Sequence, residues 1–410
     1  MAAEINQTPS SSDTPSNYRR PELLYKVDGQ IARIIKFLIL DNEEGFIIIS
    51  EDKSLRILLK RDNGQFWPSV IEYLPNLPTC LFLHETARLL FVGLVSGAVY
   101  QYEIREDWNS LELIRRYNVH TNAVTGIAYS HIGKELFSCS RDKTLIWHSA
   151  DSGNKIGMYN LGCPCSVIQF DSSTNFAFIG DANGNVYVLR INGVAAQLVS
   201  KLSAHTGAIT DLAWDSTRQL LFSASTDTLV IMWDIGGKQG QCYELNGHDS
   251  KLSAVVLGAN KNKLFSVDET GHLMCWDLNA KRIMAPAWKD SDNCQLCDVP
   301  FFWNVKVMWE RKVVGVRRHH CRTCGTSVCD NCCNYRTIFP AMGFEKPARI
   351  CRTCKKKMEE YPEKFDLTPL ATISELRQGV VDMRLHKDGN KLATIGYDRT
   401  ILLWDILQVF

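Results

Sequence analysis

The 410-residue sequence lacks a dominant charge, a long apolar run and the common catalytic signatures. Lys and Arg total 46 against 45 Asp and Glu, so no global field favours nucleic acid or a membrane. The longest apolar runs, such as Phe37–Leu40 and Ile47–Ile49, are too short to span a bilayer. GxSxG, HExxH and GxxxxGK(S/T) patterns are absent. We therefore expect a protein that is not an enzyme.

The first twenty residues also lack the apolar core of a signal peptide, and they are polar and rich in Ser and Pro. We expect residues 1–20 to form a disordered N-terminal tail and the chain to be cytosolic. Disulfides are rare in the cytosol, so clustered cysteines among the fifteen in the chain are expected to bind metal.

A repeat of about 43 residues runs through most of the chain. Trp147 and Trp233 are 86 residues apart, and Trp276 follows Trp233 by 43. A histidine precedes each of these tryptophans by 27 or 28 residues. Repeats of this length are typical of β-propellers, in which each unit forms one blade of four short strands.

Each clear unit also carries a turn before its Trp-bearing strand. The pattern resembles the WD40 repeat, in which a His, a Ser or Thr, a turn Asp and the Trp form a buried hydrogen-bonded set. The set in the clearest unit would be His205, Ser223 or Ser225, Asp227 and Trp233. We therefore assign these polar side chains a structural role and not a catalytic one.

Seven units can be placed, and the last is separated from the sixth by more than one period. Trp404 follows Trp276 by 128 residues, 85 more than one period, so an insertion precedes the last blade. Residues 22–27 (ELLYKV) would supply the strand that closes the ring in such families. We predict an all-β fold: a seven-bladed WD40 β-propeller with a small two-zinc finger inserted between blades six and seven. The expected ranges are 21–284 for the closing strand and blades one to six, 285–360 for the finger, and 361–410 for blade seven.

The insertion contains the most specific signal in the sequence, since nine of the fifteen cysteines lie within it. Eight form CxxC pairs: Cys294/Cys297, Cys321/Cys324, Cys329/Cys332 and Cys351/Cys354. Two such knuckles complete a closed, tetrahedral Cys₄ site for structural zinc. We expect two structural Zn²⁺ ions that drive folding of the segment. The spacing leaves adjacent and interleaved pairing open, and we treat Cys333 as spare.

The cysteine-rich segment is also basic. Between its first and last cysteines lie ten Lys or Arg and four Asp or Glu, a local charge of +6 in a chain of net charge +1. Arginine forks and imidazoles are suitable donors for the oxygens of a phosphomonoester. The candidate donors are Arg317, Arg318, His319, His320, Arg322 and Arg349.

The run RRHHCRTCG, followed by RIC, resembles the FYVE zinc finger over about residues 288–354. The resemblance implies interleaved zinc sites. The first would be held by Cys294, Cys297, Cys329 and Cys332, and the second by Cys321, Cys324, Cys351 and Cys354. It also implies binding of phosphatidylinositol 3-phosphate on the cytosolic face of early endosomes. A finger placed before the last blade looks like the WD-repeat and FYVE-domain-containing proteins, over nearly the whole chain.

The same family inserts an apolar loop into the bilayer, and Val314 and Gly315 would form its tip here. Two features depart from the family pattern. The Trp-x-x-Asp motif reads Trp288-Lys289-Asp290-Ser291-Asp292, which leaves open whether Asp290 or Asp292 takes the headgroup role. In addition, 23 residues separate Cys297 from Cys321, and we interpret them as an extra hairpin that contacts the propeller.

Two other zinc modules were weighed. RING fingers place a His ligand after the third Cys, whereas here His319 and His320 precede Cys321. A nucleic-acid-binding finger would interleave stacking aromatics with its basic run, and none occurs here. We therefore predict a non-enzymatic endosomal adaptor whose propeller recruits protein partners, with no nucleic-acid partner. The alternative is a RING-like ubiquitin ligase or a protein-docking finger without lipid specificity.

Overall fold

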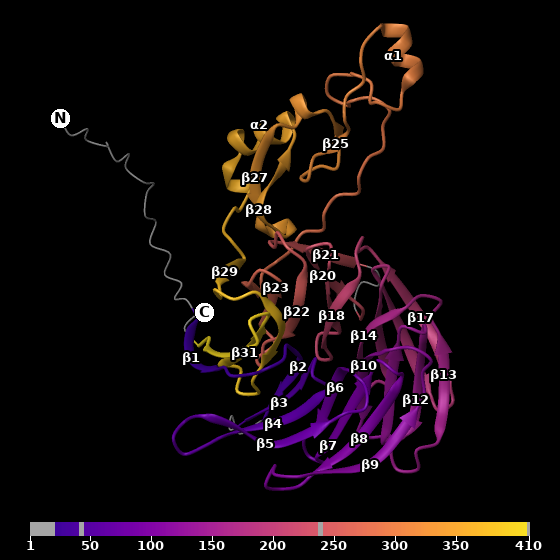
Figure 1. The fold of residues 1–410 in the computed structure, drawn as a ribbon. Coiled ribbons are helices and arrows are strands. Elements are labelled where there is room, and N and C mark those ends of the chain that lie inside the picture. The colour runs from indigo at the N-terminus through magenta and orange to yellow at the C-terminus, as the bar shows by residue number, and fades with distance from the viewer. Residues whose placement is uncertain (1–20, 41–44, 237–240, 408–410) are drawn as a thin grey trace, which may run out of the picture.

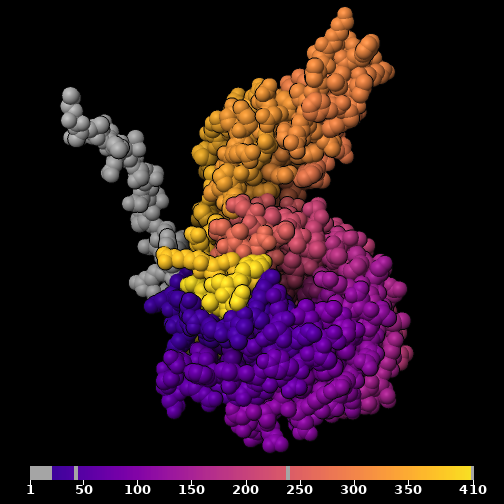
Figure 2. Space-filling view, viewed as in Figure 1, coloured from indigo at the N-terminus to yellow at the C-terminus, as the bar shows by residue number. Residues whose placement is uncertain are grey.

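The computed structural model describes residues 21–40, 45–236 and 241–407. The predicted disordered tail, residues 1–20, lies outside the described residues. Seven blades, each of four antiparallel strands, form a ring, and the cysteine-rich segment rises from one side of it (Figures 1 and 2). The predicted all-β, seven-bladed propeller with an inserted finger is confirmed.

The blades follow the chain in order, and each runs from an inner to an outer strand. The first four blades are β2 (Ile34–Ile39), β3 (Gly45–Ser50), β4 (Ser54–Lys60), β5 (Phe66–Tyr73); β6 (Pro78–His84), β7 (Leu89–Leu94), β8 (Ala98–Ile104), β9 (Leu111–Asn118); β10 (Val124–Ser130), β11 (Glu135–Ser140), β12 (Thr144–Ser149), β13 (Lys155–Asn160); and β14 (Cys165–Asp171), β15 (Phe176–Asp181), β16 (Asn185–Asn192), β17 (Ala195–Ser203). The last three are β18 (Ile209–Asp215), β19 (Leu220–Ser225), β20 (Leu229–Asp234), β21 (Gln241–Asn246); β22 (Leu252–Leu257), β23 (Lys263–Asp268), β24 (His272–Asp277), β29 (Ala371–Glu375); and β30 (Val380–Leu385), β31 (Lys391–Gly396), β32 (Ile401–Asp405), β1 (Glu22–Val27).

The sequence of each strand matches its place in the blade. The middle strand β3 reads GFIIIS and is buried at every position. The outer strand β5 reads FWPSVIEY and contains no buried residue. β-branched residues pack well on a pleated surface that is covered on both faces, so such runs occupy the middle of each sheet. Apolar faces of adjacent blades then pack together, as Ile47 of blade one and Leu90 of blade two do.

The predicted closure of the ring is confirmed. β1 pairs antiparallel with β32, with Glu22 opposite Asp405 and Val27 opposite Ile401. An N-terminal strand therefore supplies the outer edge of the last blade, which leaves the ring without a break between its first and seventh blades.

The polar set predicted for the clearest unit is also present. In blade five, Nδ1 of His205 lies 2.9 Å from a carboxylate oxygen of Asp227, and its Nε2 lies 2.8 Å from Oγ of Ser223. Nε1 of Trp233 donates to the same hydroxyl at 2.8 Å. Ser223, and not Ser225, is therefore the hydroxyl of the set. These side chains are buried and satisfy one another, which fits a structural role.

The finger lies between the Trp-bearing strands of the sixth and seventh units, as expected. The range 361–410, however, holds more than blade seven, because β29 pairs with β24 and completes blade six. The finger therefore replaces the loop between the last two strands of blade six. Its elements are α1 (Val305–Arg311), β25 (His319–His320), β26 (Ser327–Val328), η1 (Asp330–Cys332), β27 (Tyr335–Phe339), η2 (Pro340–Met342), β28 (Phe344–Ile350), α2 (Arg352–Glu360) and η3 (Pro362–Lys364).

A second junction joins the finger to blade five. β28 pairs parallel with β21, and the amide of Asn246 donates to the carbonyl of Gly343 at 2.8 Å. Gly343 has φ +86°, and a Cβ there would lie 1.7 Å from the carbonyl oxygen of Glu244. Only glycine therefore permits this close approach. The sheet of blade five thus continues through β28 and β27 into the finger.

Candidate zinc centres and phosphate-binding groove

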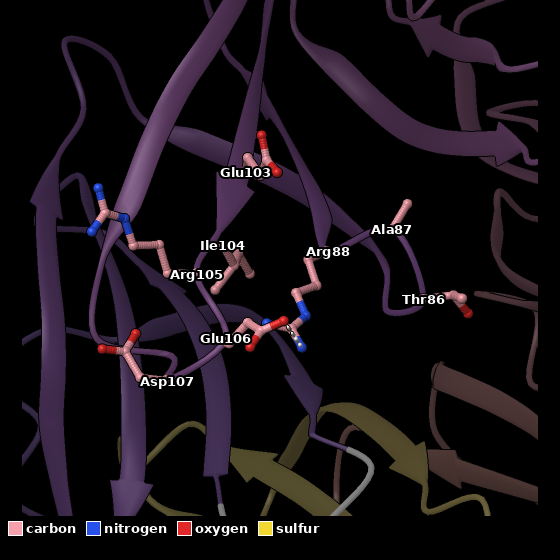
Figure 3. A pocket seen from close by; sticks show the side chains of 8 residues that line it. All are labelled: Thr86, Ala87, Arg88, Glu103, Ile104, Arg105, Glu106 and Asp107. Atoms are coloured by element: carbon pink, nitrogen blue, oxygen red, sulfur yellow. Dashed lines mark ion pairs between the residues drawn. The ribbon is translucent and has the colours of Figure 1, made fainter.

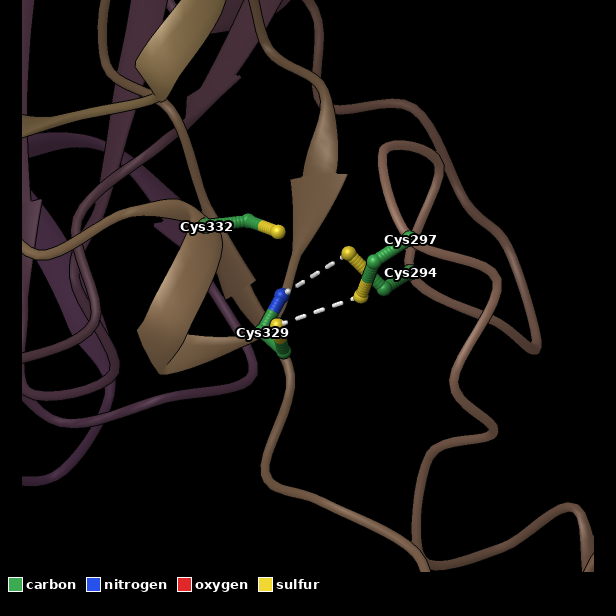
Figure 4. Close-up of side chains that lie close together, drawn as sticks. All are labelled: Cys294, Cys297, Cys329 and Cys332. Carbon is green, nitrogen blue, oxygen red and sulfur yellow. Dashed lines mark hydrogen bonds between the residues drawn. The ribbon is translucent and has the colours of Figure 1, made fainter.

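The eight predicted ligands form two groups in the structure, and their sulfurs within each group lie within 4.8 Å of one another. The first group contains Cys294, Cys297, Cys329 and Cys332 (Figure 4). The second contains Cys321, Cys324, Cys351 and Cys354. The two pairs of each group come from separate parts of the chain, so the pairing is interleaved, as the family resemblance implied.

The distances within the groups fit zinc and do not fit disulfides. The sulfurs of Cys297 and Cys329 lie 3.6 Å apart, and those of Cys324 and Cys351 lie 3.9 Å apart. A disulfide would need about 2.05 Å. A tetrahedron with Zn–S bonds of about 2.3 Å has edges of about 3.8 Å. Each group therefore suits one structural Zn²⁺ ion, and four sulfurs would leave no open coordination position.

Donors around the sulfurs are suited to thiolates. The amide of Cys329 donates to Sγ of Cys294 at 3.3 Å, and that of Cys351 donates to Sγ of Cys321 at 3.2 Å. Arg352 places Nη2 3.3 Å from Sγ of Cys332. Cys333 belongs to neither group, and burial raises the pKa of its thiol to about 12. It therefore remains a neutral, buried thiol at physiological pH.

A groove of about 330 Å³ lies between the finger and the propeller. Four of the six predicted phosphate donors line it, whereas Arg317 and Arg318 do not. The groove also contains two cations that the sequence analysis missed, Arg336 and Lys346. Its polar and charged lining residues are Asn246, Asp249, His319, His320, Arg322, Arg336, Lys346 and Arg349.

Two cations of the groove lie directly opposite each other. Arg336 on β27 faces Arg349 on β28 in the antiparallel register. Like charges in this position destabilise a strand pair. Arg349 is paired with Asp330, which offsets part of the repulsion, while the groove itself remains rich in cations. An anion in the groove that contacts both side chains would relieve the remaining repulsion.

Arg318 is held outside the groove by the offset Trp-x-x-Asp segment. Its Nη1 lies 2.8 Å from Oδ1 of Asp290, and its guanidinium lies 4.7 Å from the ring centre of Trp303. Asp292 instead accepts a hydrogen bond from Nε1 of Trp303 at 2.9 Å. Asp290 is therefore the acid nearer to the basic run, and Asp292 supports the aromatic residue that covers Arg318.

The two histidines lie on β25 at one wall of the groove. The ring of His320 stacks on Trp288 at 4.7 Å between centroids, and its Nε2 lies 3.1 Å from Oγ of Ser327. Burial lowers the pKa of both His319 and His320, and nearby arginines lower it further. The hydroxyl of Ser327 donates to the carbonyl of Lys289, so it accepts the Nε2–H of a neutral His320. A neutral His319 can still donate one N–H to a phosphate.

The predicted bilayer-inserting tip is only partly exposed. Val314 is 79% exposed. Gly315 is buried against Phe301 and Phe302, which does not fit its predicted place at an exposed tip.

The predicted extra hairpin is wrong. Residues Val305–Arg311 form helix α1, which begins at the N-cap Asn304 and lies at the end of the finger farthest from the propeller (Figure 1). It has no buried residue, and Trp309 is 85% exposed. An N-cap Asn before the short run VKVMWER was the sequence signal for this helix. The segment therefore extends the apolar end of the finger and does not contact the propeller.

A larger hollow of about 640 Å³ lies on blade two, and all of its lining residues lie between Thr86 and Asp107 (Figure 3). Across it, Arg88 and Glu106 form an ion pair at 3.6 Å. Because these opposite charges pair with each other, the hollow attracts a charged ligand less than the cation-rich groove of the finger. The groove of the finger is therefore the better candidate for an anion site, because of its side-chain charges and despite its smaller volume.

Comparisons with known proteins agree with this architecture. The family model for the FYVE zinc finger matches residues 287–360, and the model for the WD domain, G-beta repeat, matches 111–148, 196–234 and 367–405. The WD40 β-propeller domain of Doa1 superposes with a TM-score of 0.61 at 12% identity, over 94% of this chain and 97% of that one. At that identity the likeness shows the fold alone.

Full-length relatives carry both modules. The "WD repeat and FYVE domain-containing protein 2" of Caenorhabditis elegans is 45% identical over all of this chain and 98% of its own length. The human protein of the same name is 37% identical over the whole of both chains. The mouse "WD repeat and FYVE domain-containing protein 1" is 36% identical, over all of this chain and 97% of its own. The chain therefore belongs to the family of WD repeat and FYVE domain-containing proteins.

Proposed function

We propose that this chain is a non-enzymatic adaptor of early endosomes. Its finger binds phosphatidylinositol 3-phosphate at the cytosolic face of the membrane, and its propeller recruits protein partners. The observation that carries the proposal is the groove in which Arg322, Arg336 and Arg349 converge with two imidazoles beside the zinc ligands.

The groove suits a phosphomonoester better than a diffuse anionic surface. Its cations come from three separate strands or turns and face one cavity of limited volume. Each charge-assisted hydrogen bond contributes about 1.5–3 kcal/mol when well formed. Three or four such bonds would provide selective affinity for one ring phosphate, which a flat basic patch does not.

The apolar end of the finger would enter the interfacial region of the bilayer. Val314, Trp309 and Val305 are each at least 65% exposed and lie at or beside α1. Burying an exposed Val contributes about 1.5–3 kcal/mol, so loop and headgroup must act together. Among the described residues, no helix has the length and apolar character needed to cross a membrane. The proposed attachment is therefore peripheral.

Two features support a non-enzymatic role. Each zinc group has four cysteine ligands, so the ion would have no open position at which to activate a water. The histidines of blades three, five and six (His120, His205 and His248) each bond a buried Ser of their own blade, which indicates a structural role. A rigid ring that presents many surface loops suits protein recruitment.

Liposome co-sedimentation of the full chain tests the proposal. Vesicles would carry phosphatidylinositol 3-phosphate, its 4- or 5-phosphate isomers, or phosphatidylserine at equal charge. We expect binding to the 3-phosphate to fall at least tenfold in Arg322→Gln, and to be unchanged in Arg61→Gln, which removes an exposed arginine of blade one. Equal binding to every anionic vesicle would show that the groove attracts negative charge in general and does not select the 3-phosphate. No binding would favour the protein-docking or RING-like alternative.

A second variant separates the bilayer contact from the headgroup contact. Trp309→Ser should weaken binding to vesicles that carry the 3-phosphate but leave binding to a short-chain, water-soluble form of the lipid unchanged. Loss of both would show that α1 supports the groove and does not act as an anchor.

A further inference from the structure

One wall of the groove belongs to the propeller and not to the finger. Asn246, the last residue of β21, and Asp249, in the turn that leads to blade six, both line it. The parallel bridge between β21 and β28 fixes this wall relative to the finger. A ligand in the groove therefore meets the propeller as well as the finger.

Among the described residues that line the groove, Asp249 is the only acid. It forms an ion pair with Lys346 of the finger at 2.5 Å, while its own side chain remains 75% exposed. The other acids near the basic run are Asp290, paired with Arg318, and Asp330, paired with Arg349, and neither lines the groove. The propeller thus adds one negative charge to an otherwise cationic cavity.

The position of this charge matters because a membrane lipid enters the groove in one orientation. The apolar end of the finger, which carries α1, is the end farthest from the propeller (Figures 1 and 2). A bilayer that contacts this end would therefore lie on the side of the groove away from Asp249. The inositol ring is tethered to the lipid at position 1, and positions 4 and 5 lie on the far side of the ring. With a 3-phosphate held by the finger arginines, positions 4 and 5 would face the propeller wall.

We propose that Asp249 is a specificity-determining residue contributed by the propeller. It disfavours a headgroup with a second phosphomonoester at position 4 or 5, so that the groove selects a lipid with a single one. The inference rests on the proposed function of the finger. Hydroxyls at these positions can donate to the carboxylate, whereas a phosphate there would be repelled by it.

Titration of the full chain with short-chain phosphatidylinositol 3-phosphate and 3,5-bisphosphate tests the proposal. Asp249→Asn should tighten binding of the bisphosphate relative to the monophosphate by about three- to tenfold, as expected for removal of one partly screened charge. Asp249→Lys should shift the ratio further in the same direction. Asp62→Asn, which removes an exposed acid from a turn of blade one, should leave it unchanged.

The outcomes separate this inference from the function on which it rests. If the wild-type chain does not bind the monophosphate, the proposed function fails first. If the wild-type chain binds it and Asp249→Asn leaves the ratio of the two affinities unchanged, Asp249 does not determine specificity. Equal tightening of both ligands would also overturn the proposal, because it would show only that Lys346 had been released as a general phosphate donor.

Discussion

The propeller and the finger are stabilised by different interactions, although they share a continuous sheet. Each blade interface of the propeller contains many buried Val, Ile, Leu and Phe side chains. The core cluster of the finger is mostly cysteine, and its other buried members among the described residues are Phe301, Val328 and Ile350. The large ring can therefore fold by burying apolar surface, whereas the finger needs its metal ions.

Metal removal should produce the largest difference in stability between the finger and the propeller. Zinc binding stabilises small fingers by about 10–16 kcal/mol, so a strong chelator should unfold residues 285–360 while the propeller stays folded. Hydrogen exchange measured by mass spectrometry would show loss of protection confined to the finger. A matched pair of variants sharpens the test: Cys321→Ser should lose one of two zinc ions, and Cys333→Ala should retain both. A finger that stays protected without metal would refute the zinc assignment.

The junction between the two regions can be tested at Gly343. Gly343→Ala places a Cβ against the carbonyl of Glu244 and should separate β28 from β21, at a cost of about 1–3 kcal/mol or more. We expect faster exchange of the Asn246 amide, weaker lipid selectivity and unchanged zinc content. Gly64→Ala is the control, because Gly64 has a similar φ of +81° but no atom within 4 Å of the added Cβ. Equal effects of the two variants would show that backbone strain alone, and not the contact with Glu244, causes the faster exchange and the weaker selectivity.

The hydrogen-bonded sets should matter to the propeller only. Ser223→Ala removes the common partner of His205 and Trp233 and should lower the free energy of unfolding by about 1–3 kcal/mol. Zinc content and lipid binding should be unchanged. Ser216→Ala, at an exposed turn of the same blade, should have almost no effect on the melting temperature. A similar loss in both variants would argue against a special role for the set.

Mild acid should have the smallest effect of these tests. It should lower the stability of the propeller through its buried histidines. Burial lowers the pKa of His120 and His248, and lowers that of His148 to about 4. Asp142 and Asp268 face His120 and His248 and oppose this effect, whereas Lys155 adds to it at His148.

Because their folded-state pKa lies below the unfolded value, these histidines contribute stability that is complete above about pH 6.5 and is lost as the pH falls. We expect the melting temperature of the propeller to fall by about a few degrees between pH 7 and 5.5. A melting temperature that rises over this range would contradict the assignment.

The parts of the structure that recur or have strict spacing could be predicted from the sequence. The 43-residue period located all seven blades, and ELLYKV was identified as the closing strand. The CxxC pairs gave the ligands, and the family resemblance gave their interleaved pairing.

Other parts depend on contacts that spacing does not encode. Arg336 enters the groove only because β27 pairs with β28 in one register, and Asp249 only because blade five continues into the finger. The assignment of β29 to blade six likewise needs a strand pair across an insertion. Gly315 and α1 were misplaced because a short apolar run does not reveal which of its residues pack inward.

The place of the finger within blade six has a consequence for biogenesis. On the ribosome, β24 emerges before the finger, and β29 emerges after it, so blade six cannot acquire its outer strand until the whole finger has been synthesised. The ring itself closes later still, when β32 becomes available to β1. The finger therefore has the opportunity to acquire zinc while the propeller is still an open arc. In a zinc-starved cell, the nascent chain would hold an unfolded loop between two strands that must pair, which links metal supply to the yield of closed propellers.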